Sequence, residues 1–99
     1  HLKSQVSGGL LQGLGGALFE AVDFKEGKII NPSLANYRVP RFKDIPEIEI
    51  VLLDRPDISP TGSGEAPMVA LAPAIRQAIV DATNKKINQL PLIPNGLKV

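Results

Sequence analysis

Residues 61–67 read T-G-S-G-E-A-P and place one carboxylate, Glu65, on a loop. Its neighbours Gly64 and Ala66 carry almost no side chain, so a reacting group can approach the carboxylate closely. Pro67 restricts the backbone directly after the acid and limits its movement. The pattern suits a general base. The alternative is an acid before a helix, stabilised by the helix dipole by about 0.3–1 kcal/mol, and composition alone favours this alternative.

Other kinds of chemistry find no support in the sequence. The chain has no cysteine and a single histidine, His1, which removes thiolate nucleophiles and argues against a protein-ligated zinc site. A serine nucleophile lacks both its G-x-S-x-G turn and an internal histidine base. The dinucleotide pattern started at Gly13 would need glycine at Leu18, and a phosphate loop started at Gly8 has Leu14 in place of lysine.

Residues 5–22 have apolar side chains at helical spacing and predict a helix. Five glycines lie within it, each costing up to about 1 kcal/mol relative to alanine. We expect a thin face that packs closely against another backbone or a ligand, the alternative being a helix start whose bare amides contact an anionic cofactor. Gln5 and Gln12 border this face, where a glutamine amide can hydrogen-bond a planar heterocycle.

The remaining pattern predicts an α+β fold with two helices, a β-hairpin and a further strand. The hairpin joins residues 22–24 to 28–30 with Gly27 in its turn, and residues 48–53 form the further strand. The second helix follows Pro67 and ends near Thr83 or Asn84, with Pro73 starting its regular part or kinking it. A buried-type strand with only two helices to cover it indicates a piece of a larger protein.

Composition narrows the classes of partner. The 99 residues carry a net charge of +1 and have three phenylalanines and one tyrosine, so we expect no nucleic acid partner. The longest apolar window, residues 8–19, is shorter than the roughly 20 residues that a membrane span needs.

The order of several motifs resembles a known family. Residues 5–20 (Q-V-S-G-G-L-L-Q-G-L-G-G-A-L-F-E), residues 31–54 and the G-S-G-E-A-P segment resemble the end of the molybdopterin-binding large subunit of molybdenum hydroxylases, the family of xanthine dehydrogenase and aldehyde oxidoreductase. Residues 72–92 look most like its isoquinoline 1-oxidoreductase branch. The resemblance implies that residues 1–99 are a carboxy-terminal fragment of a larger molybdopterin-binding domain.

The resemblance also implies roles for three residues. The G-x-G-E-x-P pattern places the family's catalytic base on Glu65, which acts toward a water or hydroxide on molybdenum that attacks an electron-poor substrate carbon. Gln5, opening Q-x-x-G-G, corresponds to a glutamine that hydrogen-bonds the pterin, and Gly64 brings backbone close to the metal site. No residue of the chain is expected to bind the metal directly, because the pterin holds it.

The implied function is hydroxylation of an N-heterocycle or aldehyde with oxygen from water. The implied partners are the remainder of the large subunit and iron–sulfur clusters on another domain or subunit. Alone, the 99 residues are expected to be inert and to self-associate. The alternative is a small non-catalytic structural or interaction module in which Glu65 only caps a helix.

Overall fold

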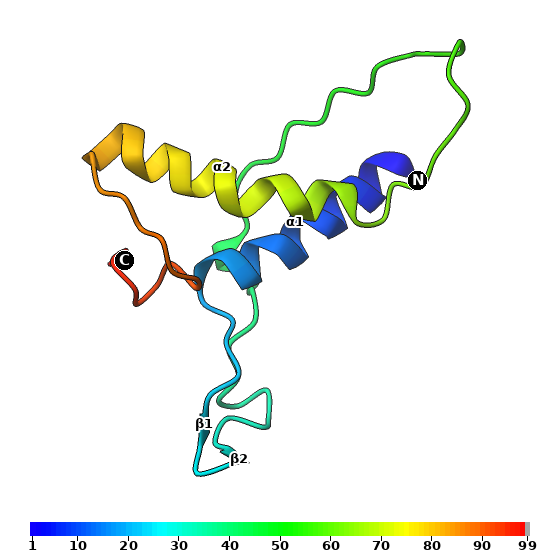
Figure 1. Cartoon of the computed structure of the whole chain (residues 1–99). Helices are drawn as coiled ribbons and strands as arrows, with labels where there is room; N and C mark the ends of the chain where they lie inside the picture. The colour runs from blue at the N-terminus through cyan, green and yellow to red at the C-terminus, as the bar shows by residue number, and fades with distance from the viewer. Residues whose placement is uncertain (99) are drawn as a thin grey trace.

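The structure is a computed structural model that describes residues 1–98, and it contains the two predicted helices and the predicted hairpin (Figure 1). Helix α1 spans Leu2–Leu18 and helix α2 spans Ala66–Thr83. Strands β1 (Phe24–Lys25) and β2 (Lys28–Ile29) form the hairpin, and a 3₁₀ turn, η1, covers Phe42–Asp44. The α+β class predicted from the sequence is confirmed.

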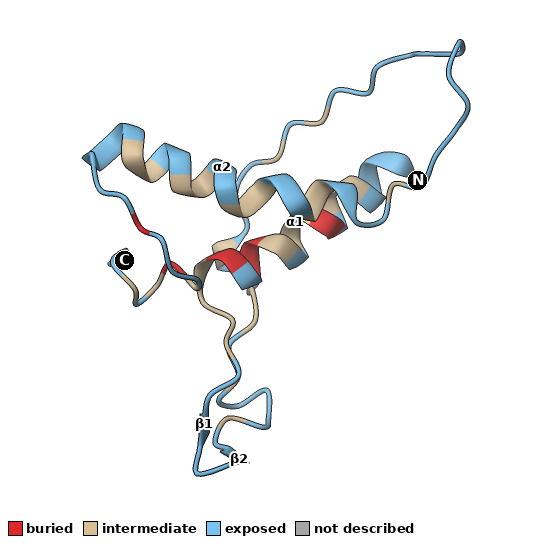
Figure 2. Ribbon diagram, in the orientation of Figure 1, coloured by how far each residue is buried: buried red, intermediate tan, exposed pale blue. Residues whose placement is uncertain are grey.

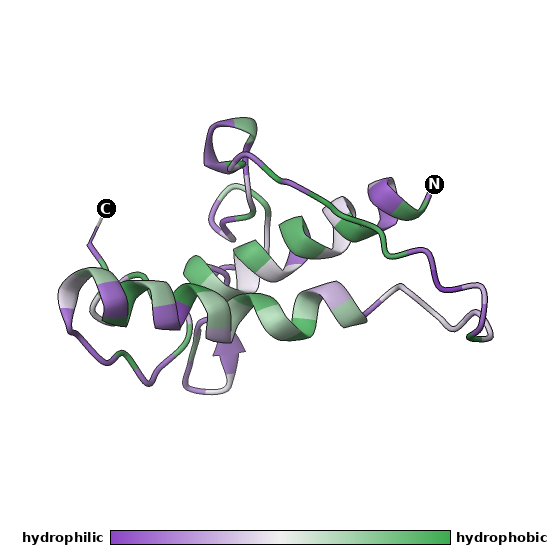
Figure 3. Ribbon diagram, turned by 90° about the horizontal axis from the view of Figure 1, so that it is seen from above, coloured by the Kyte–Doolittle hydropathy of each residue, from purple (hydrophilic) through white to green (hydrophobic). Residues whose placement is uncertain are grey.

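Helices α1 and α2 lie side by side with their amino ends at the same end of the molecule (Figures 1 and 3). Glycines of α1 make this approach possible. A Cβ atom added at Gly9 would lie 3.3 Å from the Cβ of Pro67, and one at Gly13 would lie 3.4 Å from the Cα of Met68. The predicted close-packing face is therefore present. The helix-start alternative is wrong, because α1 begins at Leu2 and its glycines lie inside the helix.

The two helices end in different ways. Helix α1 stops at Leu18, short of the predicted residue 22. The carbonyls of Ala17 and Leu18 accept hydrogen bonds of 2.8 Å from the N–H groups of Leu92 and Ile93 in the carboxy-terminal tail. Helix α2 ends as predicted, with Asn84 in the left-handed conformation at φ 57°.

Pro73 lies inside α2 and does not start its regular part, because the helix already begins at Ala66. Helix α2 begins at Ala66, two residues earlier than the predicted start after Pro67. Pro67 is tolerated in the first turn, because the N–H group that proline lacks has no partner within the helix there.

The hairpin has the turn that its sequence predicts. Phe24 faces Ile29 and Lys25 faces Lys28 in an antiparallel register. The two turn residues, Glu26 and Gly27, have positive φ values of 51° and 76°, as the common two-residue hairpin turn requires.

The further strand predicted at residues 48–53 is not formed. Within residues 1–98, the backbone groups of residues 46–54 make no backbone hydrogen bond. Ile48 and Ile50 are half-buried whereas Glu47 and Glu49 are exposed, so the alternation seen in the sequence is retained. A strand needs a hydrogen-bonded neighbour, and the only paired strands in the described residues are those of the hairpin.

The apolar core is small, and much apolar surface stays exposed (Figure 2). The buried apolar side chains are Leu14, Ala17, Ile87 and Leu92. By contrast, Phe42 is 95% exposed and Leu53 is 83% exposed. The radius of gyration is 16.1 Å, against about 13 Å for a compact domain of this length. No helix within residues 1–98 combines the length and hydropathy needed to cross a membrane.

Candidate functional site

The structure brings the sequence-predicted residues Gln5 and Gly64 together at the amino ends of the two helices. A Cβ atom added at Gly64 would have the Nε2 of Gln5 as its nearest neighbour, at 3.9 Å. The carbonyl oxygen of Gly64 lies 3.5 Å from the position of a Cβ at Gly9. The G-S-G-E-A-P loop therefore rests on the first turns of α1, and Glu65 follows directly after this contact.

Glu65 occupies the position just before α2, in a helical backbone conformation with φ −101° and ψ −28°. Its side chain is exposed and makes no capping hydrogen bond to the helix. A capping acid accepts a hydrogen bond from a backbone N–H of the first turn, and this interaction is missing. The structure thus places Glu65 where a cap would stand without giving it the contact that defines a cap.

Gln5 and Glu65 both keep their polar groups available. Neither side chain makes a hydrogen bond or ion pair within residues 1–98, and both are exposed. The amide of Gln5 can donate and accept hydrogen bonds, and the carboxylate of Glu65 can accept a proton. The site offers one neutral and one ionisable group beside bare backbone.

Within residues 1–98, no packing contact requires residue 64 to be glycine. Its φ is not in the left-handed range, and an added Cβ would make only an ordinary contact with Gln5. The glycine leaves room for a group outside this chain to approach the backbone. The open backbone at Gly64, the amide of Gln5 and the carboxylate of Glu65 are groups that a cofactor from outside this chain can contact.

The described residues contribute no metal-binding cluster. Among residues 1–98, no three histidine, cysteine, aspartate or glutamate side chains gather closely enough to hold a metal ion.

A hollow of about 240 Å³ lies between the helices and residues 46–49. Its lining comes mainly from Leu10, Leu14, Ile48 and Leu71, and it includes neither Gln5 nor Glu65. The hollow is mostly apolar, and its two carboxylates come from Glu47 and Glu49 and not from the predicted site residues.

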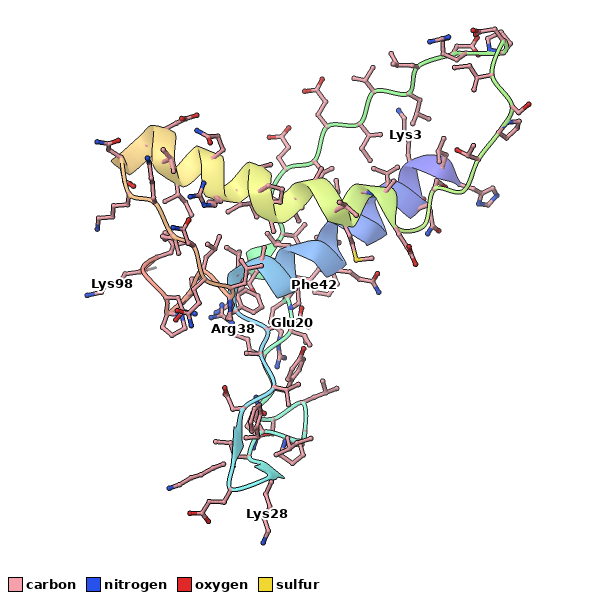
Figure 4. The ribbon with its side chains drawn as sticks, viewed as in Figure 1. Lys3, Glu20, Lys28, Arg38, Phe42 and Lys98 are labelled. Carbon is pink, nitrogen blue, oxygen red and sulfur yellow. The ribbon has the colours of Figure 1, made fainter. Side chains whose placement is uncertain are left out.

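A polar junction fixes the opposite end of α1, where the chain leaves the helix for the hairpin (Figure 4). The Tyr37 hydroxyl donates a 3.0 Å hydrogen bond to the carboxylate of Glu20, and this bond raises the pKa of Tyr37. A Cβ at Gly15 would overlap the Glu20 carboxylate and come within 2.9 Å of the Cδ of Pro40. These contacts anchor the helix that carries Gln5.

Arg38 strengthens the same junction from the hairpin side. Its guanidinium lies 3.9 Å from the centre of the Phe19 ring and 3.6 Å from a carboxylate oxygen of Asp44. Both are attractive contacts, of which the cation–π interaction is worth roughly 0.5–1 kcal/mol at an exposed site. The junction is structural and lies at the far end of α1 from Glu65.

Comparison with known proteins connects this geometry to a family. Residues 1–46 match the family model described as a molybdopterin cofactor-binding domain, a match that contains Gln5 and ends before Glu65. The xanthine dehydrogenase molybdenum-binding subunit of Escherichia coli O157:H7 is 40% identical over 101 residues, covering 96% of this chain and 13% of that protein. The aldehyde oxidoreductase molybdenum-binding subunit PaoC of E. coli (strain K12) is 35% identical over 97 residues, covering 91% of this chain and 13% of that protein.

The beta subunit of isoquinoline 1-oxidoreductase from Brevundimonas diminuta is 30% identical over 93 residues, covering 94% of this chain and 12% of that protein. The branch expected from residues 72–92 is thus among the relatives, at lower identity than the xanthine dehydrogenase subunit. The chain belongs to the family of molybdopterin-binding subunits represented by xanthine dehydrogenase and aldehyde oxidoreductase. It spans about one eighth of the length of these relatives.

Sequence reasoning named Gln5, Gly64 and Glu65 but missed the residues that hold them together. Gly9 and Pro67 make the contact between α1 and the loop. The sequence predicts that Pro67 restricts the backbone after Glu65 and that the glycines form a close-packing face, but it does not pair these two residues. The available signal was the four-residue spacing of Gly9, Gly13 and Ala17, which places small residues along one face of a helix.

Proposed function

We propose that this chain supplies the general base, Glu65, and a cofactor contact, Gln5, to the large subunit of a molybdenum-dependent oxidoreductase. The observation that carries the proposal is the approach of Gln5 to the loop of Glu65 at the amino ends of α1 and α2. The named activities of the relatives are oxidations of xanthine, aldehyde and isoquinoline, which favours an N-heterocycle or an aldehyde as substrate class.

The overall reaction assigns a task to the base. Hydroxylation of a substrate C–H group by water gives the hydroxylated product, two protons and two electrons. The molybdenum cofactor supplies the two-electron redox centre when bound. In this proposal the carboxylate of Glu65 accepts one of the protons, and its exposure and its lack of a hydrogen-bond partner within residues 1–98 support that role.

Gln5 and Gly64 act by holding and admitting the cofactor. The amide of Gln5 offers a donor and an acceptor to the polar edge of a pterin. Gly64 leaves the backbone beside that amide uncovered, so that the ring system lies close to the loop of Glu65. Together they orient the reacting groups, and such orientation contributes to rate by itself.

The remaining parts of the enzyme come from outside these 99 residues. Exposed apolar side chains such as Phe42 and Leu53, and the extended dimensions, support a chain that completes its core against the remainder of a larger molybdopterin-binding domain. We include iron–sulfur clusters on another domain or subunit as the route for the two electrons. The isolated chain is then inert.

The test compares two glutamates in the full-length protein. Glu65→Gln removes the base while keeping the size of the side chain, and Glu49→Gln makes the same change at an exposed glutamate outside the site. We expect Glu65→Gln to lose at least about a hundredfold in kcat, in line with general-base catalysis, with molybdenum and pterin content unchanged. Glu49→Gln keeps its activity. Turnover retained in Glu65→Gln would favour the non-catalytic alternative.

A further inference from the structure

We propose that Gly9 is a positioning residue for Glu65. Its missing side chain sets how closely the loop of Glu65 rests on α1, and so fixes the carboxylate relative to Gln5. This inference rests on the proposed role of Glu65 as the base. It adds a residue that touches neither substrate nor cofactor to the determinants of the rate.

The contacts of Gly9 are to both sides of Glu65. A Cβ at Gly9 would lie 3.3 Å from the Cβ of Pro67 and 3.5 Å from its Cγ, and also 3.5 Å from the carbonyl oxygen of Gly64. Gly9 is buried under this segment. The loop therefore contacts α1 through the residue before Glu65 and through the proline two positions after it.

The neighbours of Gly9 cannot rotate away from an added methyl group. The oxygen of Gly64 belongs to the backbone, and the ring of Pro67 is fixed to its own backbone at φ near −65°. A contact of 3.3 Å requires a neighbour to move by a few tenths of an ångström. The movement has to be taken by the loop, and Glu65 is part of it.

The same helix carries Gln5 one turn before Gly9. Residues four apart share a helix face, so Gln5 and Gly9 present adjoining surfaces to the loop. The Gly9 contact therefore sets the spacing between the helix that carries Gln5 and the loop backbone that carries Glu65. A displaced loop changes this spacing even when both side chains are intact.

Other glycines of α1 provide comparisons. An added Cβ at Gly16 would meet nothing within 4 Å, so Gly16→Ala makes the same chemical change without a contact. Gly13 contacts α2 farther along, through Met68 and the flexible side chain of Leu71. Only Gly9 of these three touches the segment that carries Glu65.

The experiment uses the full-length enzyme with the variants Gly9→Ala, Gly16→Ala, Pro67→Gly, the Gly9→Ala/Pro67→Gly double variant, and Glu65→Gln. Kinetics, cofactor content and thermal unfolding are measured for each. Gly9→Ala is expected to lower kcat about tenfold while KM and cofactor content stay within twofold, because small misplacements of a catalytic group lower rate strongly. Gly16→Ala keeps its kcat.

Pro67→Gly removes the two proline carbons that a methyl group at position 9 would meet and leaves the contact with the carbonyl oxygen of Gly64. The double variant is therefore expected to regain part of the kcat lost in Gly9→Ala, giving a non-additive cycle. If Gly9→Ala does not fold, Pro67→Gly alone tests the contact from the other side, and a lowered kcat with unchanged cofactor content is expected.

The outcomes separate the two proposals. If Glu65→Gln is inactive while Gly9→Ala keeps its kcat, the positioning role is overturned and the proposed function stands. Equal losses in Gly9→Ala and Gly16→Ala, or a loss that follows cofactor content or melting temperature, also overturn positioning. Retained turnover in Glu65→Gln overturns the proposed function itself, whatever Gly9→Ala shows.

Discussion

Gln5 and Gly64, which are far apart in the sequence, meet where the amino ends of α1 and α2 lie together. The Nε2 of Gln5 would be 3.9 Å from a Cβ added at Gly64, and within residues 1–98 it is the nearest atom outside residues 63–65. The relationship joins the segment matched by the molybdopterin family model to the loop that carries Glu65. It turns two separate motifs into one site.

Gly64 gives the first prediction. The chain tolerates a side chain there, so Gly64→Ala is expected to change the free energy of unfolding by no more than about 0.5 kcal/mol. Turnover of the full-length enzyme should nevertheless fall, because the methyl group occupies space kept for the cofactor. Kinetics and cofactor content measure this, with Gly62→Ala as the control, since a Cβ at Gly62 meets nothing within 4 Å. Undiminished activity in Gly64→Ala would remove its proposed role.

Gly15 gives a prediction about stability. Gly15→Ala places a methyl group into the Glu20 carboxylate and against Pro40, so we expect a loss of about 1–3 kcal/mol in the free energy of unfolding. Urea unfolding followed by circular dichroism measures it. Gly16→Ala makes the same change one residue later without a clash and should be neutral or slightly stabilising. Equal stability of the two variants would contradict the packing at this junction.

We predict that the stability of the folded chain decreases at alkaline pH because of Tyr37. The hydrogen bond to Glu20 raises the pKa of Tyr37, so the folded chain holds the phenolic proton more tightly than the unfolded chain. The resulting stabilisation is complete below the unfolded pKa of about 10 and is lost as the pH rises through the folded pKa. Tyr37 is the single tyrosine and there is no tryptophan, so phenolate absorbance reports it alone in the 99-residue chain.

Glu20→Ala is the matching variant for this titration. It removes the acceptor, and the pKa of Tyr37 should return toward its ordinary value. If the titration midpoint of Tyr37 is unshifted in the unmodified chain, or is the same in the unmodified chain and in Glu20→Ala, the hydrogen bond does not persist in solution.

Exposed apolar surface predicts self-association of the isolated chain. Phe42 and Leu53 are largely exposed, and within residues 1–98 only four apolar side chains are buried. Sedimentation velocity should show oligomers that grow with concentration. Phe42→Ser and Leu53→Ser should reduce them, whereas Lys28→Ser, a change at an exposed polar residue, should not. A stable monomer across the concentration range would contradict a chain that completes its core elsewhere.

Local patterns predicted the parts of the fold that need only local interactions. Helical spacing identified α1 and α2, and K-E-G identified the hairpin turn where Glu26 and Gly27 adopt positive φ. The end of α1 could not be placed, because the carbonyls of Ala17 and Leu18 bond to Leu92 and Ile93 at the other end of the chain. The strand at residues 48–53 was wrong here, because apolar alternation does not itself provide a neighbouring strand.

For the candidate site, too, the sequence identified some residues and could not identify others. Glu65 and Gln5 were named from motifs, and the sequence also showed that Gly64 and Ala66 leave the acid uncovered. The contact of Gly9 with Gly64 and Pro67 could not be predicted, since it depends on how two distant helices cross. Glycine spacing indicates a close approach but does not identify the partner.

The most direct test of the central claim is a structure of the full-length protein with its cofactor bound. We predict that the carboxylate of Glu65 faces the metal end of the cofactor and that the amide of Gln5 hydrogen-bonds the pterin, with the loop resting on Gly9. A carboxylate directed into bulk solvent, away from the cofactor, would contradict the assignment of Glu65 as the base.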